Sequence, residues 1–197
     1  MHESTHEGRI TLLLGVTGAG KSTHLRQLLA SPTIDRFLCW DLKGEFGRDG
    51  SISARRWPTL RALLEHVRGG APHGREIVRA SVREFPAMLR YAYTAGNMLL
   101  VIEELSAFCT ADKFPRDEVL DLAHRSRERG LDVVIVAQRP LRMPTDLRSQ
   151  AKDFVVYRLD DPLDVRELQN QLALTDAAVL PVRSLTRGVF RKWSRGF

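Results

Sequence analysis

Short apolar runs alternate with amphipathic segments along most of this chain. The runs are dominated by leucine, valine and isoleucine, as strands buried on both faces are. The predicted strands are residues 10–14, 37–40, 76–81, 97–104, 133–137, 154–158 and 189–190. The segments between them carry apolar residues at helical spacing, which indicates helices with one buried face. The predicted helices are residues 22–30, 58–67, 86–95, 117–129, 164–172 and 175–180.

This alternation of strands and helices predicts an α/β fold with a mostly parallel, doubly wound sheet and helices on both faces. A chain of 197 residues can bury one sizeable core, so we expect a single domain over residues 1–197 with a basic C-terminal tail at 181–197. No apolar run is long enough to cross a bilayer. The polar first residues lack the features of a signal peptide, from which we expect a cytoplasmic protein.

A glycine-rich loop follows the first predicted strand. Residues 15–22, Gly-Val-Thr-Gly-Ala-Gly-Lys-Ser, match the Walker A pattern G-x-x-x-x-G-K-[ST] between a strand and a helix, the context that the pattern requires. Backbone N–H groups of such a loop point at phosphate oxygens, and the positive end of the helix adds to the attraction. We therefore expect ATP and Mg²⁺ to bind here. The candidate nucleotide-binding residues are Thr17, Gly18, Ala19, Gly20, Lys21, Ser22 and Thr23.

Three side chains of this loop have separate expected roles. Lys21 would reach the β- and γ-phosphates, Ser22 would ligate Mg²⁺ through its hydroxyl, and Thr23 would donate to the α-phosphate. An ordinary glycine turn before a helix is the alternative. The full motif after a strand argues against that alternative.

Two acidic residues, Glu103 and Glu104, end the apolar run at 97–104, as a Walker B pair would. We assign Glu103 to the metal and Glu104 to the general base that polarises the attacking water. The first position is more often Asp, so the longer Glu103 leaves open whether it ligates directly or through water. Two solvated turn carboxylates are the alternative.

Two further polar residues follow predicted strands. Gln138 follows the run at 133–137, where its amide could bind the γ-phosphate or the lytic water, or could cap a loop. Asp41 follows the strand at 37–40, at the sheet edge where ligands bind in open α/β folds. It could orient water or metal, or be a carboxylate of a surface turn.

Basic residues gather in two places. Arg125, Arg127 and Arg129 surround the end of the helix predicted at 117–129, where cations are favourable in any helix. The tail carries a second group without intervening acids, and the net charge of +6 favours a polyanionic partner. A solvated basic surface is the alternative to a nucleic-acid contact. The tail group comprises Arg183, Arg187, Arg191, Lys192 and Arg195.

The ordered combination of these motifs resembles the FtsK/HerA superfamily of DNA-translocating ATPases. The resemblance is carried by the Walker A loop, residues 41–45, the strand ending at Glu103-Glu104, the sequence Arg127-Glu128-Arg129-Gly130 and the strand that precedes Gln138. It covers residues 10 to about 169. The short chain without added domains looks most similar to the genome-packaging ATPases of membrane-containing icosahedral viruses.

The resemblance implies a RecA-like core, a homo-oligomeric ring, usually a hexamer, and ATP-driven movement of double-stranded DNA. It also implies that Arg127 acts on the neighbouring subunit's site and that Gln138 is the polar sensor, and it matches Arg158 more loosely to a further family arginine. Capsid or portal-vertex proteins would be the partners of a viral enzyme, in the host cytoplasm or the virion.

Other functions fit parts of the pattern. A cellular or plasmid-encoded segregation or conjugation ATPase would share the same motor. A small P-loop kinase would have a similar length, but such kinases usually have an arginine-rich lid instead of a Walker B pair followed by a glutamine-bearing strand. A non-hydrolysing, nucleotide-gated assembly or secretion protein is supported only by the atypical Glu103.

Overall fold

The computed structural model describes residues 7–69, 73–79, 81–107 and 116–195. Its strands are β1 (Ile10–Leu14), β2 (Phe37–Asp41), β3 (Arg55–Trp57), β4 (Arg75–Arg79), β5 (Met98–Ile102), β6 (Leu131–Ala137), β7 (Asp153–Val156) and β8 (Arg191–Ser194). Its α-helices are α1 (Lys21–Ala30), α2 (Leu60–Arg68), α3 (Phe85–Ala95), α4 (Arg116–Arg125), α5 (Thr145–Gln150), α6 (Pro162–Leu172) and α7 (Asp176–Val179). Short 3₁₀ helices are Val82–Glu84, Leu105–Ala107, Arg127–Arg129, Pro140–Arg142 and Leu180–Ser184.

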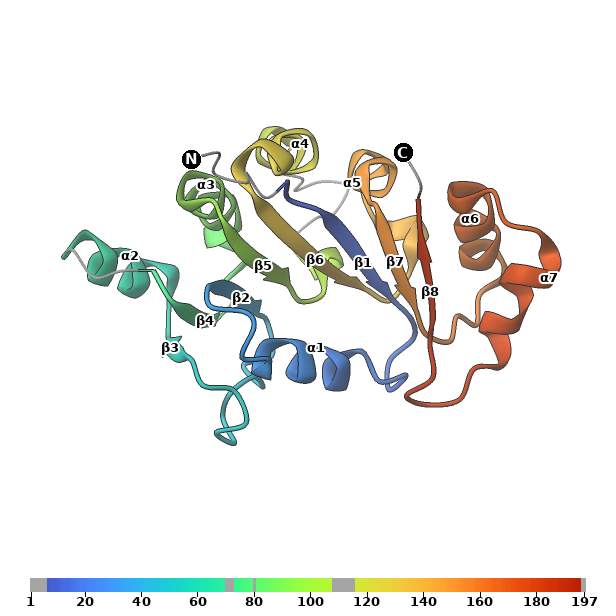
Figure 1. Cartoon of the computed structure of the whole chain (residues 1–197), viewed down its shortest axis with the longest axis horizontal. Coiled ribbons are helices and arrows are strands. Elements are labelled where there is room, and N and C mark those ends of the chain that lie inside the picture. The colour runs from blue at the N-terminus through green and yellow to red at the C-terminus, as the bar shows by residue number, and fades with distance from the viewer. Residues whose placement is uncertain (1–6, 70–72, 80, 108–115, 196–197) are drawn as a thin grey trace.

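The strands form one sheet in the order β3-β4-β2-β5-β6-β1-β7-β8 (Figure 1). All neighbouring pairs in it are parallel except β7 and β8, which are antiparallel. The predicted α/β class and mostly parallel sheet are therefore confirmed. β1 lies between β6 and β7, with Leu12 opposite Ile135 and Phe154. The glycine-rich loop thus leaves the middle of the sheet.

Successive side chains of β1 point into two different cores, one on each face of the sheet. Leu12 and Leu14 belong to the larger core, which α2 to α7 cover, whereas Leu13 belongs to the smaller core with Leu25 and Leu29 of α1. This alternation follows from the period of two in a strand. Helices therefore cover both faces, as predicted, but unequally.

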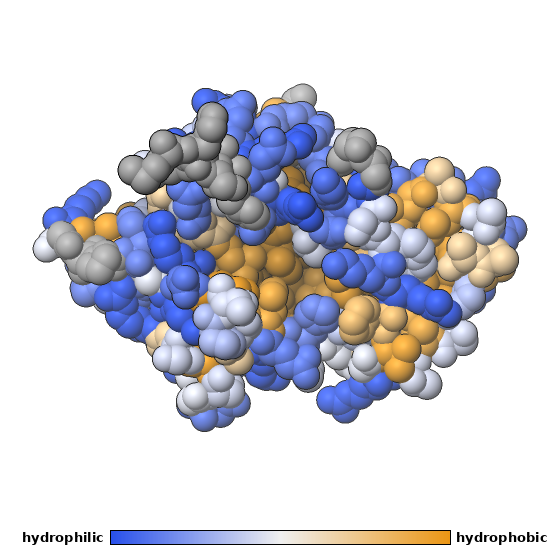
Figure 2. Space-filling model, in the orientation of Figure 1, coloured by the Kyte–Doolittle hydropathy of each residue, from blue (hydrophilic) through white to orange (hydrophobic). Residues whose placement is uncertain are grey.

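α1 covers only part of its face of the sheet (Figure 1). Beside it lies an open groove of about 540 Å³, whose lining includes Thr11, Leu99 and Val134. Figure 2 shows apolar side chains on the floor of this hollow and polar ones around it. No helix among the described residues is long and apolar enough to cross a bilayer.

Two predicted elements differ from the structure by more than two residues at an end, and the others by at most two. The helix predicted at 117–129 ends at Arg125, because a tighter 3₁₀ turn and the left-handed Gly130 (φ 60°) turn the chain into β6. The last edge strand, predicted to contain 189–190, is present but lies further along the chain, since β8 begins at Arg191. Residues 186–189 instead form a turn, closed by the N–H of Val189 on the carbonyl of Thr186 (3.1 Å).

Two short elements were not predicted. β3 has three residues, two of them exposed arginines, so it carries no apolar run. α5 has six residues, too few for a helical period to show.

Candidate nucleotide-binding and catalytic site

The Walker A loop connects β1 to α1 through glycines that no other residue could replace without strain. Gly15 has φ 148°, and a Cβ there would lie 2.7 Å from the Cβ of Tyr157. Gly20 has φ 117°, and a Cβ there would lie 3.1 Å from the Cα of Gly188. Both positive angles favour glycine. The backbone can therefore curl tightly against its neighbours before α1 begins.

Lys21 is the first residue of α1, and its side chain folds back over the loop. Its Nζ donates to the carbonyl oxygens of Gly15 (2.6 Å) and Val16 (2.9 Å). Burial lowers the pKa of Lys21, while the acids Glu104 and Glu103 oppose that shift. Within the described part of the chain, the hydrogen bonds of the Lys21 ammonium thus go to these two backbone carbonyls.

A cleft of about 160 Å³ lies beside this loop at the carboxyl ends of β1, β5 and β6. The structure brings six of the seven predicted loop residues, both candidate acids and Gln138 together around it. The seventh loop residue, Ala19, does not line the cleft, because its side chain is buried in the smaller core. The lining residues of the cleft are Thr17, Gly18, Gly20, Lys21, Ser22, Thr23, Arg26, Lys43, Glu103, Glu104, Val136, Gln138 and Arg187.

Asp41 is a buried structural residue, which corrects its interpretation as a carboxylate of a surface turn. Only 1% of it is exposed, and its carboxylate accepts the backbone N–H groups of Gly44 (2.8 Å), Glu45 (3.2 Å) and Phe46 (3.0 Å). It does not line the cleft. Asp41 therefore shapes the turn that carries Lys43 to the cleft.

Glu103 is buried beside Asp41, with 3% of its surface exposed. Burial and the charge of Asp41 raise the pKa of Glu103 to about 7, although the N–H of Lys43, 3.4 Å from its Oε2, opposes the shift. The carboxylate oxygens of Glu103 are hard ligands of the kind that Mg²⁺ prefers. Glu103 and the Ser22 hydroxyl line the same cleft, so these residues fit a bound Mg²⁺.

The raised pKa of Glu103 gives a stability prediction for metal-free protein. A raised pKa in the folded state stabilises it below the ordinary value of 4.5, and this contribution is lost as the pH rises to about 7. Glu103→Gln cannot ionise, so relative to this variant the original chain should lose about 3 kcal/mol of unfolding free energy between pH 4.5 and pH 8. Denaturant unfolding across this range measures the difference. If the unfolding free energies of the two proteins changed in the same way with pH, the raised pKa of Glu103 would be contradicted.

Glu104 directly follows Glu103 but points differently, because its backbone has a left-handed φ of 57°. Such an angle is uncommon outside glycine and is often held in place at functional sites. Its Oε2 accepts the Gln138 amide Nε2–H (2.9 Å), and its Oε1 accepts the Ser106 hydroxyl (2.6 Å). Two neighbouring side chains thus fix the orientation of this carboxylate at the mouth of the cleft.

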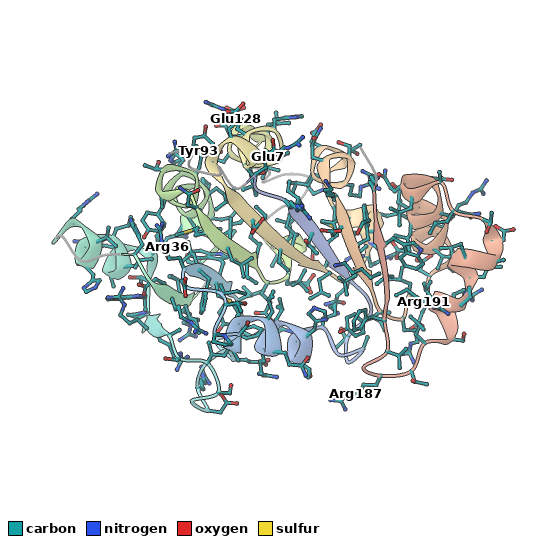
Figure 3. All side chains as sticks on the ribbon, viewed as in Figure 1. Glu7, Arg36, Tyr93, Glu128, Arg187 and Arg191 are labelled. Carbon is teal, nitrogen blue, oxygen red and sulfur yellow. The ribbon has the colours of Figure 1, made fainter. Side chains whose placement is uncertain are left out.

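Arg127 lies outside this cleft, at the edge where β1 and β6 begin. Its Nη2 donates to Oε2 of Glu7 (2.6 Å), and the side chains of the pair are 62% and 70% exposed. The length of β6, about 20 Å, separates this edge from the P-loop. Figure 3 shows Glu7 at the top of the molecule and the cleft residue Arg187 at the bottom. Arg127 therefore cannot act on the site of its own chain in this structure.

The two neighbouring arginines have structural contacts. Arg129 donates to the carbonyls of Tyr93 (3.0 Å) and Thr94 (2.8 Å) in the last turn of α3. The guanidinium of Arg125 lies 5.1 Å from the centre of the Tyr93 ring. Their positions thus follow the ordinary preference for cations near helix ends.

The basic tail is largely a folded part of the sheet. Arg195 donates to main-chain carbonyls of Gln171 (2.6 Å) and Ser149 (2.7 Å) and lies over the Phe154 ring, so its guanidinium is engaged within its own chain. Burial also lowers its pKa. Arg191 and Lys192, in contrast, are exposed on the edge strand β8 (Figure 3 labels Arg191).

Three basic residues of the cleft were missed as site residues in the sequence. Arg26 lies one helical turn after Ser22, a spacing that could have indicated it. Lys43 follows β2, whose carboxyl end lies at the same sheet edge. Arg187 comes from the other end of the chain, and no motif marks it.

Similarity to solved structures shows the fold. No protein-family model matches the sequence, and no curated protein matches it either. The genome-packaging NTPase B204 of Sulfolobus turreted icosahedral virus 2, solved with AMPPCP, is 16% identical, with a TM-score of 0.74 over 97% of this chain and 93% of that one.

More distant neighbours have the same fold. VirB4 of Thermoanaerobacter pseudethanolicus is 10% identical, with a TM-score of 0.64 over 95% of this chain and 87% of that one. The cytoplasmic domain of the Thermomonospora curvata type VII secretion ATPase EccC is 18% identical, with a TM-score of 0.59 over 96% of this chain and 24% of that one. The predicted resemblance to this class of P-loop ATPases is thus confirmed at the level of the fold.

Proposed function

We propose that this chain is an ATPase that moves double-stranded DNA, and that it packages a viral genome into a preformed capsid. The observation that carries the proposal is the single cleft that holds the Walker A lysine, the acid pair and Gln138. The fold shared with B204 over nearly the whole length of both chains supports the packaging role.

Phosphate binding would replace contacts that the loop now makes with itself. The carbonyls of Gly15 and Val16 hold the Lys21 ammonium at the loop. On ATP binding, Lys21 would turn to the β- and γ-phosphates while the loop N–H groups surround them. Ser22 and Glu103 would hold Mg²⁺, which neutralises phosphate charge when bound.

Hydrolysis would depend on the carboxylate of Glu104. Gln138 and Ser106 fix its two oxygens, so the carboxylate could accept a proton from a water placed in line with the γ-phosphate. Gln138 would leave Glu104 for the γ-phosphate or the water, which would couple phosphate binding to the orientation of the base.

Arg127 would complete this chemistry from a neighbouring copy of the chain in a ring. Its exposed side chain is held only by the exposed Glu7 among the described residues, so it could exchange that partner for a phosphate. The planar guanidinium suits the charge that develops on the transferred phosphoryl group.

DNA contact is expected from exposed cations of β8, and the salt dependence of binding tests it. Arg191→Ala with Lys192→Ala should weaken duplex binding and reduce the slope of log affinity against log salt by about 1 to 2, because up to two phosphate contacts are lost. Arg166→Ala, an exposed arginine on α6, is the matched control. An unchanged slope in the double variant would contradict this DNA contact, and the two cations would then only protect the exposed edge of the sheet.

A secretion or conjugation motor is the second candidate, because the fold also matches VirB4 and EccC. Such a motor could act on a protein instead of DNA.

Displacement of a triplex-forming strand separates these functions. We expect the protein with MgATP to displace a third strand from the end of linear duplex DNA, and Glu104→Gln to fail. ATP hydrolysis without displacement and without DNA binding would favour the secretion motor. Transfer of the γ-phosphate to a small acceptor would favour a kinase.

A further inference from the structure

The segment 185–190, here called the strap, joins the last 3₁₀ helix to β8 and passes over the Walker A loop (Figure 1). The N–H of Gly188 donates to the carbonyl of Ala19 in that loop (2.9 Å). Gly188 also lies close to Gly20: a Cβ added to Gly20 would be 3.1 Å from the Cα of Gly188. The strap and the phosphate-binding loop are therefore in direct backbone contact.

A tight turn and an aromatic contact fix the strap. The hydrogen bond from Val189 to Thr186 closes a turn with Arg187 and Gly188 at its tip, and Gly188 takes the positive φ of 83° that a type II turn requires. Phe190 then packs edge-on against His24 of α1, with 5.3 Å between ring centres. Phe190 also lies 5.4 Å from the Tyr157 ring, whose hydroxyl lies 3.0 Å from Nδ1 of His24.

Arg187 is the charged side chain at the tip of this turn. It lines the cleft with Lys21, Ser22 and Thr23, and within the described ranges it has no hydrogen bond or ion pair. Figure 3 shows its side chain extending freely from the strap at the P-loop end of the molecule. A free guanidinium beside a phosphate-binding loop suits recognition of phosphate oxygens.

The contacts of the strap indicate which phosphates it would reach. Gly188 touches Gly20, and Phe190 touches His24, so the strap lies along the start of α1. Thr23, also at the start of α1, is the residue expected at the α-phosphate. Glu104 and Gln138, which would face the γ-phosphate, follow β5 and β6 and so do not lie along α1.

We propose that Arg187 is a nucleotide-binding residue that pairs in its own chain with the α- and β-phosphates of nucleoside di- and triphosphates. This inference rests on the proposed nucleotide binding and replaces the expected DNA contact of Arg187. Because the two phosphates are common to ADP and ATP, Arg187 would contribute equally to both affinities. It would hold the nucleotide and leave the chemical step unchanged.

The test is the dissociation constant of ADP and of ATP, measured by calorimetry on the full chain without DNA. Arg187→Ala should weaken both nucleotides by about tenfold, the effect of one lost charged hydrogen bond. Arg166→Ala removes the same charge from α6 and should change neither constant. Thermal unfolding of both variants checks that they fold, and Arg187→Lys should recover part of the affinity.

The outcomes separate this inference from the proposed function. ADP affinity unchanged in a folded Arg187→Ala variant would overturn the inference, and so would a loss confined to ATP or to DNA binding. If the original chain bound neither nucleotide, the proposed function itself would fail, and the assignment of Arg187 with it.

Discussion

Arg127→Ala is expected to keep ATP binding and to lose hydrolysis by a factor of about 10³ or more, the range of arginine fingers. The residue lies at the sheet edge opposite the cleft, so its effect would come through a neighbouring subunit. Steady-state hydrolysis and ATP affinity measure the two quantities. Arg125→Ala is the matched control: its guanidinium is engaged over Tyr93, and its hydrolysis rate should stay close to that of the original chain.

Mixing of two inactive variants tests whether Arg127 acts between subunits. A ring of Arg127→Ala and Glu104→Gln subunits contains interfaces where an intact Glu104 meets a neighbour's intact Arg127. Activity should therefore return in proportion to the fraction of such interfaces. If hydrolysis did not recover in a mixture shown to have exchanged subunits, Arg127 would not act between subunits and would be only the surface ion-pair partner of Glu7.

Lys21→Ala is expected to reduce hydrolysis by at least about 10² to 10³ and to weaken ATP binding, since the cation aimed at the β- and γ-phosphates is lost. The backbone N–H groups of the loop remain, so some nucleotide affinity should persist. Hydrolysis and ATP affinity are both measured.

Glu104→Gln is the comparison for this variant. It keeps Lys21 and should bind ATP with undiminished affinity while losing general-base catalysis, worth about 10² to 10⁴ in rate. Normal turnover in Lys21→Ala would contradict the interpretation of the loop as the site of phosphate binding.

The main features of the fold could be predicted because they depend on local pattern. The apolar runs that became β1, β5 and β6 are buried on both faces, and the glycine-rich loop requires a strand before it and a helix after it. The carboxyl ends of parallel neighbouring strands meet at one sheet edge, so the convergence of Lys21, Glu104 and Gln138 followed from the same pattern.

Other features depend on contacts between distant parts of the chain, which the pattern does not contain. Nothing in the sequence shows that Asp41 accepts hydrogen bonds from three backbone N–H groups or that Arg195 donates to main-chain carbonyls. Arg187 reaches the cleft because Gly188 contacts the loop around Ala19. A count of basic residues assigned Arg187 and Arg195 to one tail, whereas the structure gives them different surroundings.

The left-handed backbone of Glu104 was also beyond sequence analysis. A strand followed by two acids predicts that their side chains diverge, but not which one turns to Gln138. The structure places Glu103 in the buried pair with Asp41 and Glu104 at the cleft mouth.

The rate of ATP hydrolysis with and without linear double-stranded DNA tests the central claim most directly. We expect Mg²⁺-dependent hydrolysis that rises severalfold with duplex DNA and declines again at high salt, because the DNA contacts are ionic. Lys21→Ala should lower the rate under both conditions by at least about 10². Hydrolysis that is the same with and without duplex DNA at low salt would contradict the account of this protein as a DNA motor.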